Sequence, residues 1–211
     1  MYLPTAFRDD RPEVAHDVIR RHPLGLLVSA GSGGLLADPL PFLVYPEEGE
    51  FGTLRAHLAR ANPHWQVLSS VDECMVAFMA EQAYVSPAWY AAKREHGKVV
   101  PTWNYAAVHA WGKPRVIEDA AWLRRLLNDL THSQESHRLE PWHVDDAPAD
   151  YLEVMVGAIV GVEIPIRRLE GKFKASQNRP AADRAGVVEG LRADGAAAMA
   201  ALVEARGQGK L

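Results

Sequence analysis

Short apolar segments separated by turn signals constrain the fold of this chain more than any other feature. Residues 24–30, 35–45 and 51–57 are rich in apolar side chains, and clusters at 31–34 and 46–50 that contain Gly or Pro separate them. Segments of this length between such clusters are typical of β-strands joined by tight turns. We therefore expect the first third of the chain to form an antiparallel meander.

The remainder of the chain adds further strands and several helices. We expect strands at 74–79, 83–87, 102–111, 113–117 and 158–166, and helices that begin near residues 12, 62, 120, 148, 183 and 195. Strands and helices do not alternate as in a parallel α/β sheet, which argues against a Rossmann fold. The predicted fold class is mainly β with appended helices (α+β), built as a small antiparallel barrel.

Two prolines predict the place of one strand in the sheet. Pro39 and Pro41 lie two residues apart within 35–45, and proline has no N–H to donate to a neighbouring strand. Such a segment is tolerated at the edge of a sheet and not at its centre.

Charge and cysteine content limit the classes of function. The formal net charge is −4, whereas proteins that bind nucleic acid through phosphate attraction usually carry a basic domain or stripe. Cys74 is the only cysteine, so no disulfide can form within the chain, as is usual in the cytoplasm. We see no apolar run long enough to cross a membrane and no apolar leader at the N-terminus.

A first candidate site lies where a strand ends and a helix begins. Arg55 and His57 close the strand, and Arg60 and Asn62 follow on the turn. Cations beside the free N–H groups of a helix start suit an anion such as a phosphate monoester. The alternative is a surface turn with solvated arginines, in which Asn62 only caps the helix.

A second candidate is the aromatic segment 100–109. Trp103, Asn104 and Tyr105 offer a flat apolar wall with polar edges, which is what a planar heterocycle requires. A core strand with aromatic packing explains the same residues equally well.

A third candidate is the basic run from Ile166 to Arg179. Its cations outnumber Glu170, the one acid, and its polar residues include Lys172, Lys174, Gln177 and Arg179. A phosphate clamp, a nucleic-acid contact and a solvated hairpin are all compatible with such a run.

Metal and nucleophile motifs are not found. There is no His-Glu-x-x-His and no cysteine pair for a metal, and Ser86 lacks the Gly-x-Ser-x-Gly setting of a hydrolase. We therefore expect no metal site, and the sequence names no catalytic residue.

Taken together, these segments resemble the PaiB family of FMN-binding negative transcriptional regulators. The resemblance rests on the opening Met-Tyr-Leu-Pro, on 57–65, on 84–90, on Val-Pro-Thr-Trp-Asn-Tyr at 100–105, and on Ser-Gln-Asn-Arg at 176–179. It implies an antiparallel split β-barrel of the FMN-binding type, a cytoplasmic homodimer, and FMN bound at the subunit interface. The barrel domain would span 1–170, and 171–211 would add the basic segment and C-terminal helices packed on it.

The resemblance also implies roles for the candidate residues. Arg55, His57, Arg60 and Asn62 would hold the phosphate and ribityl side of FMN. Trp103, Asn104 and Tyr105 would reach the ring, and Lys172, Lys174, Gln177 and Arg179 would close the site or complete the phosphate clamp.

Three functions remain open at this point. The first is a regulator of gene expression that acts through DNA or a protein partner, although the acidic net charge makes direct DNA binding doubtful. The second is an FMN-dependent oxidoreductase or flavin reductase. The third is a barrel that holds haem or another planar ligand.

Overall fold

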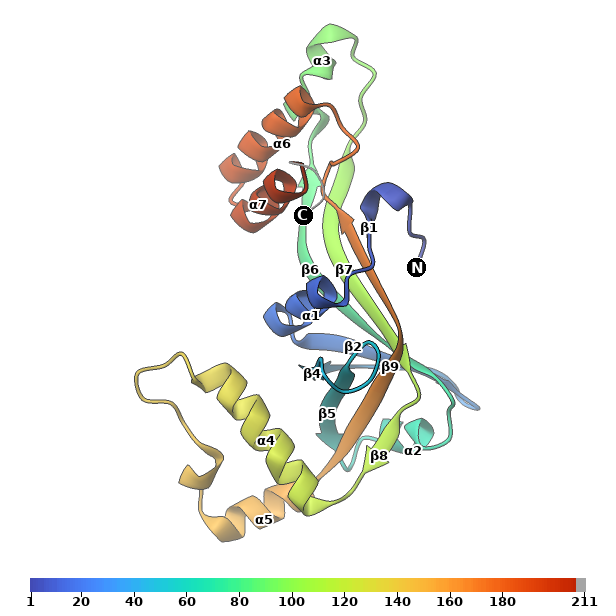
Figure 1. Cartoon of the computed structure of the whole chain (residues 1–211), viewed down its shortest axis with the longest axis vertical. Coiled ribbons are helices and arrows are strands. Elements are labelled where there is room, and N and C mark those ends of the chain that lie inside the picture. The colour runs from blue at the N-terminus through green and yellow to red at the C-terminus, as the bar shows by residue number, and fades with distance from the viewer. Residues whose placement is uncertain (208–211) are drawn as a thin grey trace. The chain divides into compact units, whose positions relative to one another are not determined.

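The computed structural model describes residues 1–207, in which nine strands form one sheet flanked by helices (Figure 1). Neighbouring strands follow the order β3-β2-β6-β7-β9-β5-β4, and β1 and β8 both pair with β9. The strands are β1 (Arg8–Asp9), β2 (Leu24–Gly31), β3 (Gly34–Pro41), β4 (Leu43–Tyr45), β5 (Thr53–Ala59), β6 (Cys74–Val85), β7 (Thr102–Gly112), β8 (Arg115–Ile117) and β9 (Ile159–Lys174). The α-helices are α1 (Pro12–Arg21), α2 (His64–Leu68), α3 (Ala92–Glu95), α4 (Ala120–Glu135), α5 (Ala149–Gly157), α6 (Ala181–Ala193) and α7 (Ala197–Gly207), with 3-10 turns η1 (Thr5–Phe7), η2 (Pro87–Trp89) and η3 (Val144–Asp146).

The predicted fold class is confirmed. β2 pairs antiparallel with β3 and β6, and β9 pairs antiparallel with β1, β5 and β8. β3, which carries Pro39 and Pro41, is the edge strand that the prolines predict. Within residues 1–207, no helix is both long enough and apolar enough to cross a membrane.

Two boundaries differ from the sequence-based expectation. The expected strand 35–45 is interrupted at Phe42, whose side chain is buried edge-on against Phe78 and whose N–H donates to the carbonyl of Pro23. The polar run after Ile166 is not irregular, because β9 continues to Lys174. β9 pairs here with β1, where Arg8 lies opposite Lys172, and it also neighbours β7, so strands remote in sequence hold this part of β9 extended.

The chain divides into two compact units. Unit 1 comprises Met1–Val14, Met79–Val108 and the segment from Glu170 onward; unit 2 comprises Ala15–Phe78 and His109–Leu169. β6, β7 and β9 each have residues in both units. The segment expected to pack on the barrel as an appendage, 171–211, thus belongs to unit 1 with 1–14 and 79–108, although 208–211 lie outside the described residues.

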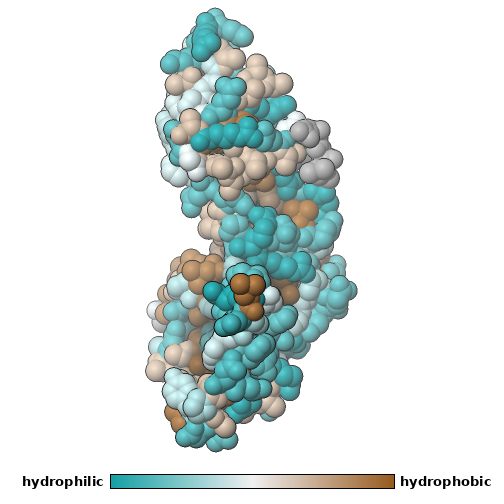
Figure 2. Space-filling view, turned by 90° about the vertical axis from the view of Figure 1, so that its left-hand side faces the viewer, coloured by the Kyte–Doolittle hydropathy of each residue, from teal (hydrophilic) through white to brown (hydrophobic). Residues whose placement is uncertain are grey.

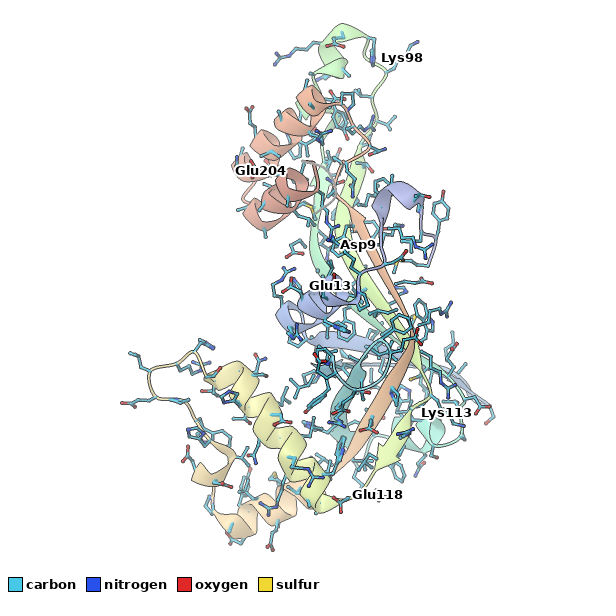
Figure 3. The ribbon with its side chains drawn as sticks, in the orientation of Figure 1. Asp9, Glu13, Lys98, Lys113, Glu118 and Glu204 are labelled. Atoms are coloured by element: carbon cyan, nitrogen blue, oxygen red, sulfur yellow. The ribbon has the colours of Figure 1, made fainter. Side chains whose placement is uncertain are left out.

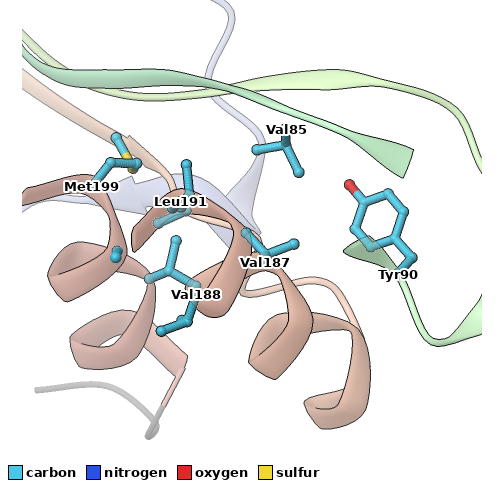
Figure 4. Close-up of a cluster of buried hydrophobic side chains, with 9 residues drawn as sticks. Val85, Tyr90, Val187, Val188, Leu191 and Met199 are labelled. Carbon is cyan, nitrogen blue, oxygen red and sulfur yellow. The ribbon is translucent and has the colours of Figure 1, made fainter. Parts of the chain in front are cut away.

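The core of unit 1 lies between its strands and the α6–α7 helix pair (Figure 4). Val85 and Ala175 from the strand side meet Val187, Leu191 and Met199 from the helices. Gly190 of α6 lets the helix approach the Trp89 ring closely, because a Cβ at this position would lie 2.2 Å from that ring. One face of these strands is therefore covered by helices.

A buried hydrogen-bond relay fixes α2 to the β2–β3 hairpin in unit 2. Ser29 Oγ lies 2.8 Å from His64 Nε2, and His64 Nδ1 lies 2.6 Å from an oxygen of Asp38. The serine and histidine are buried, while the Asp38 side chain is 32% exposed. A hydrolase uses the same three residue types with an accessible serine. Here the serine is buried and cannot reach a substrate, so we interpret the relay as stabilising the fold.

We expect His64→Ala to lower the free energy of unfolding by about 2–4 kcal/mol, because it leaves buried Ser29 without a partner and removes a bond to a carboxylate. Urea unfolding of the purified protein measures this. His137→Ala, at an exposed position, is the matched control and should change stability by less than about 0.5 kcal/mol. Equal stability of both variants would contradict a structural role for the relay.

Asp9 joins the two ends of unit 1. Its buried carboxylate accepts hydrogen bonds from Arg11 at 2.9 and 2.7 Å and from Arg206 of α7. Burial alone would raise the pKa of the Asp9 carboxyl, but the bonds from Arg11 and Arg206 outweigh burial and lower it. A carboxyl with a depressed pKa stabilises the fold above its unfolded pKa, and this contribution is lost as the pH falls.

We therefore expect Asp9→Asn to lose about 3 kcal/mol of unfolding free energy near pH 7, since it leaves arginines without their counter-charge. The difference from the wild type should shrink as the pH falls below about 4, the ordinary aspartate range. Denaturant unfolding at several pH values measures the difference. A difference that stayed constant with pH would show that the carboxylate charge is not what stabilises this junction.

Candidate functional site

The structure places the predicted site residues in two sets, one in each unit. In unit 2, Arg55 and His57 lie on β5. The Arg55 guanidinium donates to Glu163 at 2.9 Å and to Glu48 at 2.7 Å, and it stacks 4.3 Å from the centre of the Tyr45 ring. Two carboxylates thus neutralise this cation.

Arg60 and Asn62 also have partners within unit 2. Arg60 donates to Glu118 at 2.5 Å and to the carbonyls of Gly157 and Ile159. Asn62 Oδ1 accepts from the N–H of His64 at 2.9 Å, so it caps the start of α2.

The hollows beside these arginines are small or carry balanced charge. Arg55 lines one of about 170 Å³, which is below the range of roughly 300–1,000 Å³ for small-molecule sites. The hollow beside Arg60 is about 380 Å³, but Glu118 and Glu153 line it together with Arg60 and Arg124. A phosphate would have to displace or face carboxylates at either place, so the phosphate role of this set stays a prediction.

His57 of this set carries a buried polar atom with spare hydrogen-bonding capacity. Its Nδ1 is buried and has no hydrogen-bond partner among the described residues. Burial lowers the pKa of the His57 imidazole, so the ring is neutral near pH 7.

In unit 1, the pleat of β7 puts the two aromatic candidates on one face of the strand and Asn104 on the other. Trp103 is 49% exposed and Tyr105 is partly exposed on one face, while Asn104 between them is buried on the other. Trp103 also packs edge-on against Tyr84 of β6 at 6.2 Å. Trp103 and Tyr105 can therefore meet a ligand on the face that α6 and α7 leave uncovered, here called the open face.

Two lysines of β9 lie beside these aromatic rings. The ammonium of Lys172 is 5.2 Å from the centre of the Tyr105 ring and 5.6 Å from that of Tyr2. The ammonium of Lys174 donates to Thr102 Oγ1 at 2.5 Å. Alternation along a strand puts both lysines on one side, with Phe173 between them facing Arg206 on the other.

The two remaining candidates shape the turn after β9. Gln177 Oε1 accepts from the N–H of Ala175, and its Nε2 donates to the carbonyl of Phe173, so this side chain holds the turn. The Arg179 guanidinium lies 4.8 Å from the centre of the Tyr90 ring.

Asn104 marks the buried side of the same turn. Its Nδ2 donates to Ser176 Oγ at 2.9 Å, and Ser176 adopts a left-handed backbone with φ of 59°. Asn104 is 1% exposed, and its Oδ1 has no hydrogen-bond partner among residues 1–207. A buried acceptor without a donor is costly, and a donor group of a ligand or water would relieve that cost.

The three candidate cations of unit 1 lack carboxylate partners. No carboxylate forms a salt bridge with Lys172, Lys174 or Arg179 in the described part of the chain. The pKa of the Lys174 ammonium is lowered, mainly by burial and further by the positive charges of Lys172 and Arg179. Tyr105 raises this pKa in part but does not cancel the lowering. Mutual repulsion of this kind is relieved by an anion.

These residues fit FMN in their chemistry. Lysines without counter-ions suit its phosphate, and the exposed aromatic side chains suit its planar ring, whereas Asn104 lies on the other face of β7. Sequence reasoning did not single out Tyr2, Tyr84 and Thr102, which line this region. The pairing of β9 with β1 is not visible in the local sequence, although Tyr2, Tyr84 and Thr102 all lie in segments that carry the resemblance.

Comparisons with known proteins identify relatives of this chain. Residues 1–168 match the family described as "Putative FMN-binding domain". The chain is 34% identical to an uncharacterized protein of Emericella nidulans, covering all of this chain and 99% of that protein. It is 31% identical to the protease synthase and sporulation protein PAI 2 of Bacillus subtilis, over 91% of this chain and 89% of that protein.

A solved structure shows the fold. The FAD and heme binding protein of Mycobacterium smegmatis aligns with a TM-score of 0.57 at 17% identity, covering 79% of this chain and 73% of that one. The arrangement of strands is thus that of the split-barrel flavin proteins, and the resemblance to the PaiB family is confirmed. By the family match over most of its length, this chain belongs to the FMN-binding domain family, whose cofactor is FMN.

Proposed function

We propose that this chain is a homodimeric FMN-binding protein that represses gene expression, with FMN on the open face of unit 1. The observation that carries the proposal is the placement of Lys172 and Lys174, without counter-ions, beside Tyr105 and the exposed Trp103. Bound FMN would supply a planar, redox-active ring.

Each residue has a defined task in this proposal. Lys172 and Lys174 bind the phosphate, and charge-assisted bonds from their ammonium groups give most of the affinity. Trp103 and Tyr105 shelter the ring. Arg179 adds positive potential, while Gln177 positions it by holding the turn.

The openness of this face supports a homodimer. Small-molecule sites usually bury most of the ligand's surface, which an open face cannot do alone. Unit 2 also has a sheet face without charge: Leu24, Leu26 and Leu35 are 65%, 42% and 77% exposed. Leu26 pairs with Ala77 and Pro39 on that face, so apolar side chains continue across three strands. A second copy would cover it.

The regulatory part of the proposal is supported by the relative in Bacillus subtilis, which is named for protease synthesis and sporulation. The net charge of −4 favours action through a protein partner over direct DNA contact. We place the protein in the cytoplasm because its one cysteine is buried and unpaired. Transcript levels that stayed unchanged after deletion of the gene would contradict the regulatory part.

Titration of FMN into variants tests the proposed site. We expect Lys174→Ala and Lys172→Ala each to weaken FMN binding by about 10- to 100-fold, the loss of one charge-assisted bond. Quenching of FMN fluorescence measures the affinity.

Two matched variants interpret the result. Lys113→Ala removes an exposed lysine paired with Asp72 and should leave the affinity unchanged. Loss of affinity in Arg60→Ala, with both β9 lysine variants unaffected, would place the phosphate beside Arg60 and contradict the site in unit 1.

A further inference from the structure

A helical arm in unit 2, formed by residues 120–157, exposes an apolar stripe. Tyr151, Val154 and Met155 follow the spacing i, i+3, i+4 on α5, so they share one face of the helix. They are 55%, 64% and 39% exposed, while Leu152 and Val156 on the same helix are buried. A helix that packs with one face and exposes large apolar side chains on another is typical of an interaction surface.

Acidic residues surround this stripe. Asp145, Asp150 and Glu153 are exposed, and none of them has a salt-bridge or hydrogen-bond partner within the described residues. The lower half of Figure 2, where the arm faces the viewer, shows apolar side chains in small groups among hydrophilic ones. The arm is therefore an apolar surface with unpaired negative charge.

The end of unit 1 between β6 and β7 has the opposite charge. Lys93 and Arg94 lie on α3, and Lys98 lies in the loop that follows it (Figure 3). All three are exposed and form no salt bridge in the described part of the chain. Val100, two residues after Lys98, is 64% exposed. Glu95 is the one acid of α3, so this basic tip combines an exposed apolar side chain with a net positive charge.

We propose that the acidic arm of one copy docks on the basic tip of a second copy. The two surfaces match in charge and in apolar content, and both remain exposed in a single chain. In a twofold dimer the same contact occurs twice, arm to tip and tip to arm. Contact between two arms, or between two tips, would instead bring like charges together.

The inference rests on the homodimer of the proposed function and adds a charged contact to the apolar faces that a second copy would cover. Nucleic acid is the competing occupant of the tip, because its phosphates would also attract Lys93, Arg94 and Lys98. That occupant would leave the acidic arm and its apolar stripe without a partner, so a second copy accounts for more of the observations.

Charge reversal in two complementary variants tests the contact. Asp150→Lys with Glu153→Lys makes the arm basic, and Lys93→Glu with Lys98→Glu makes the tip acidic. We expect each double variant to dimerise at least tenfold more weakly than the wild type in sedimentation equilibrium at low salt. An equimolar mixture of the two should form a heterodimer with near wild-type affinity, because both of its contacts are attractive, which also shows that both variants fold.

A matched control changes the net charge by the same amount as the arm variant, at a different surface. Glu47→Lys with Glu50→Lys lies in an exposed turn and should leave dimerisation unchanged. Wild-type-like self-association of both test variants, or no heterodimer in the mixture, would overturn the proposal. So would a tip variant that dimerises normally but loses binding to a DNA duplex.

Titration of FMN into the wild type separates this inference from the proposed function. A monomer that binds FMN would overturn the interface and leave the cofactor site standing. A dimer that binds no FMN would overturn the cofactor site alone.

Discussion

The repulsion between cations on one face of β9 is the constraint on which this account depends. Lys172 and Lys174 stand two residues apart, so the pleat of the strand points them to the same side. Neither has a carboxylate partner in the described residues, whereas Arg55 and Arg60 in unit 2 each have at least one. A protein that holds like charges together without neutralising them is arranged to receive an anion.

The rest of unit 1 supports this placement. Helices α6 and α7 cover the other face of the strands, where Val187 and Leu191 build an apolar core. The same pleat that puts the lysines on the open face, with Lys172 largely buried beneath aromatic rings, puts Phe173 on the face covered by the helices. It separates Trp103 and Tyr105 from Asn104 in the same way. Core packing and the proposed FMN site therefore use alternate residues of the same two strands.

Much of this could be predicted from sequence, and the exceptions have physical causes. Turn signals and proline positions indicated the antiparallel strands and the edge strand, because those are local properties. The extension of β9 to Lys174 depends on β1, more than 160 residues away in the sequence, as the pairing of Arg8 with Lys172 shows. Arg55 is neutralised by Glu163, which is also remote in sequence. Local sequence therefore could not distinguish this paired arginine from Lys174, which has no carboxylate partner among the described residues.

Hydrogen–deuterium exchange with and without FMN tests the central claim most directly, because it reports which backbone segments a ligand stabilises. Binding on the open face predicts slower exchange at 102–108 of β7 and 170–176 of β9 when FMN is added. Slower exchange confined to 53–62, around Arg55 and Arg60, would contradict it.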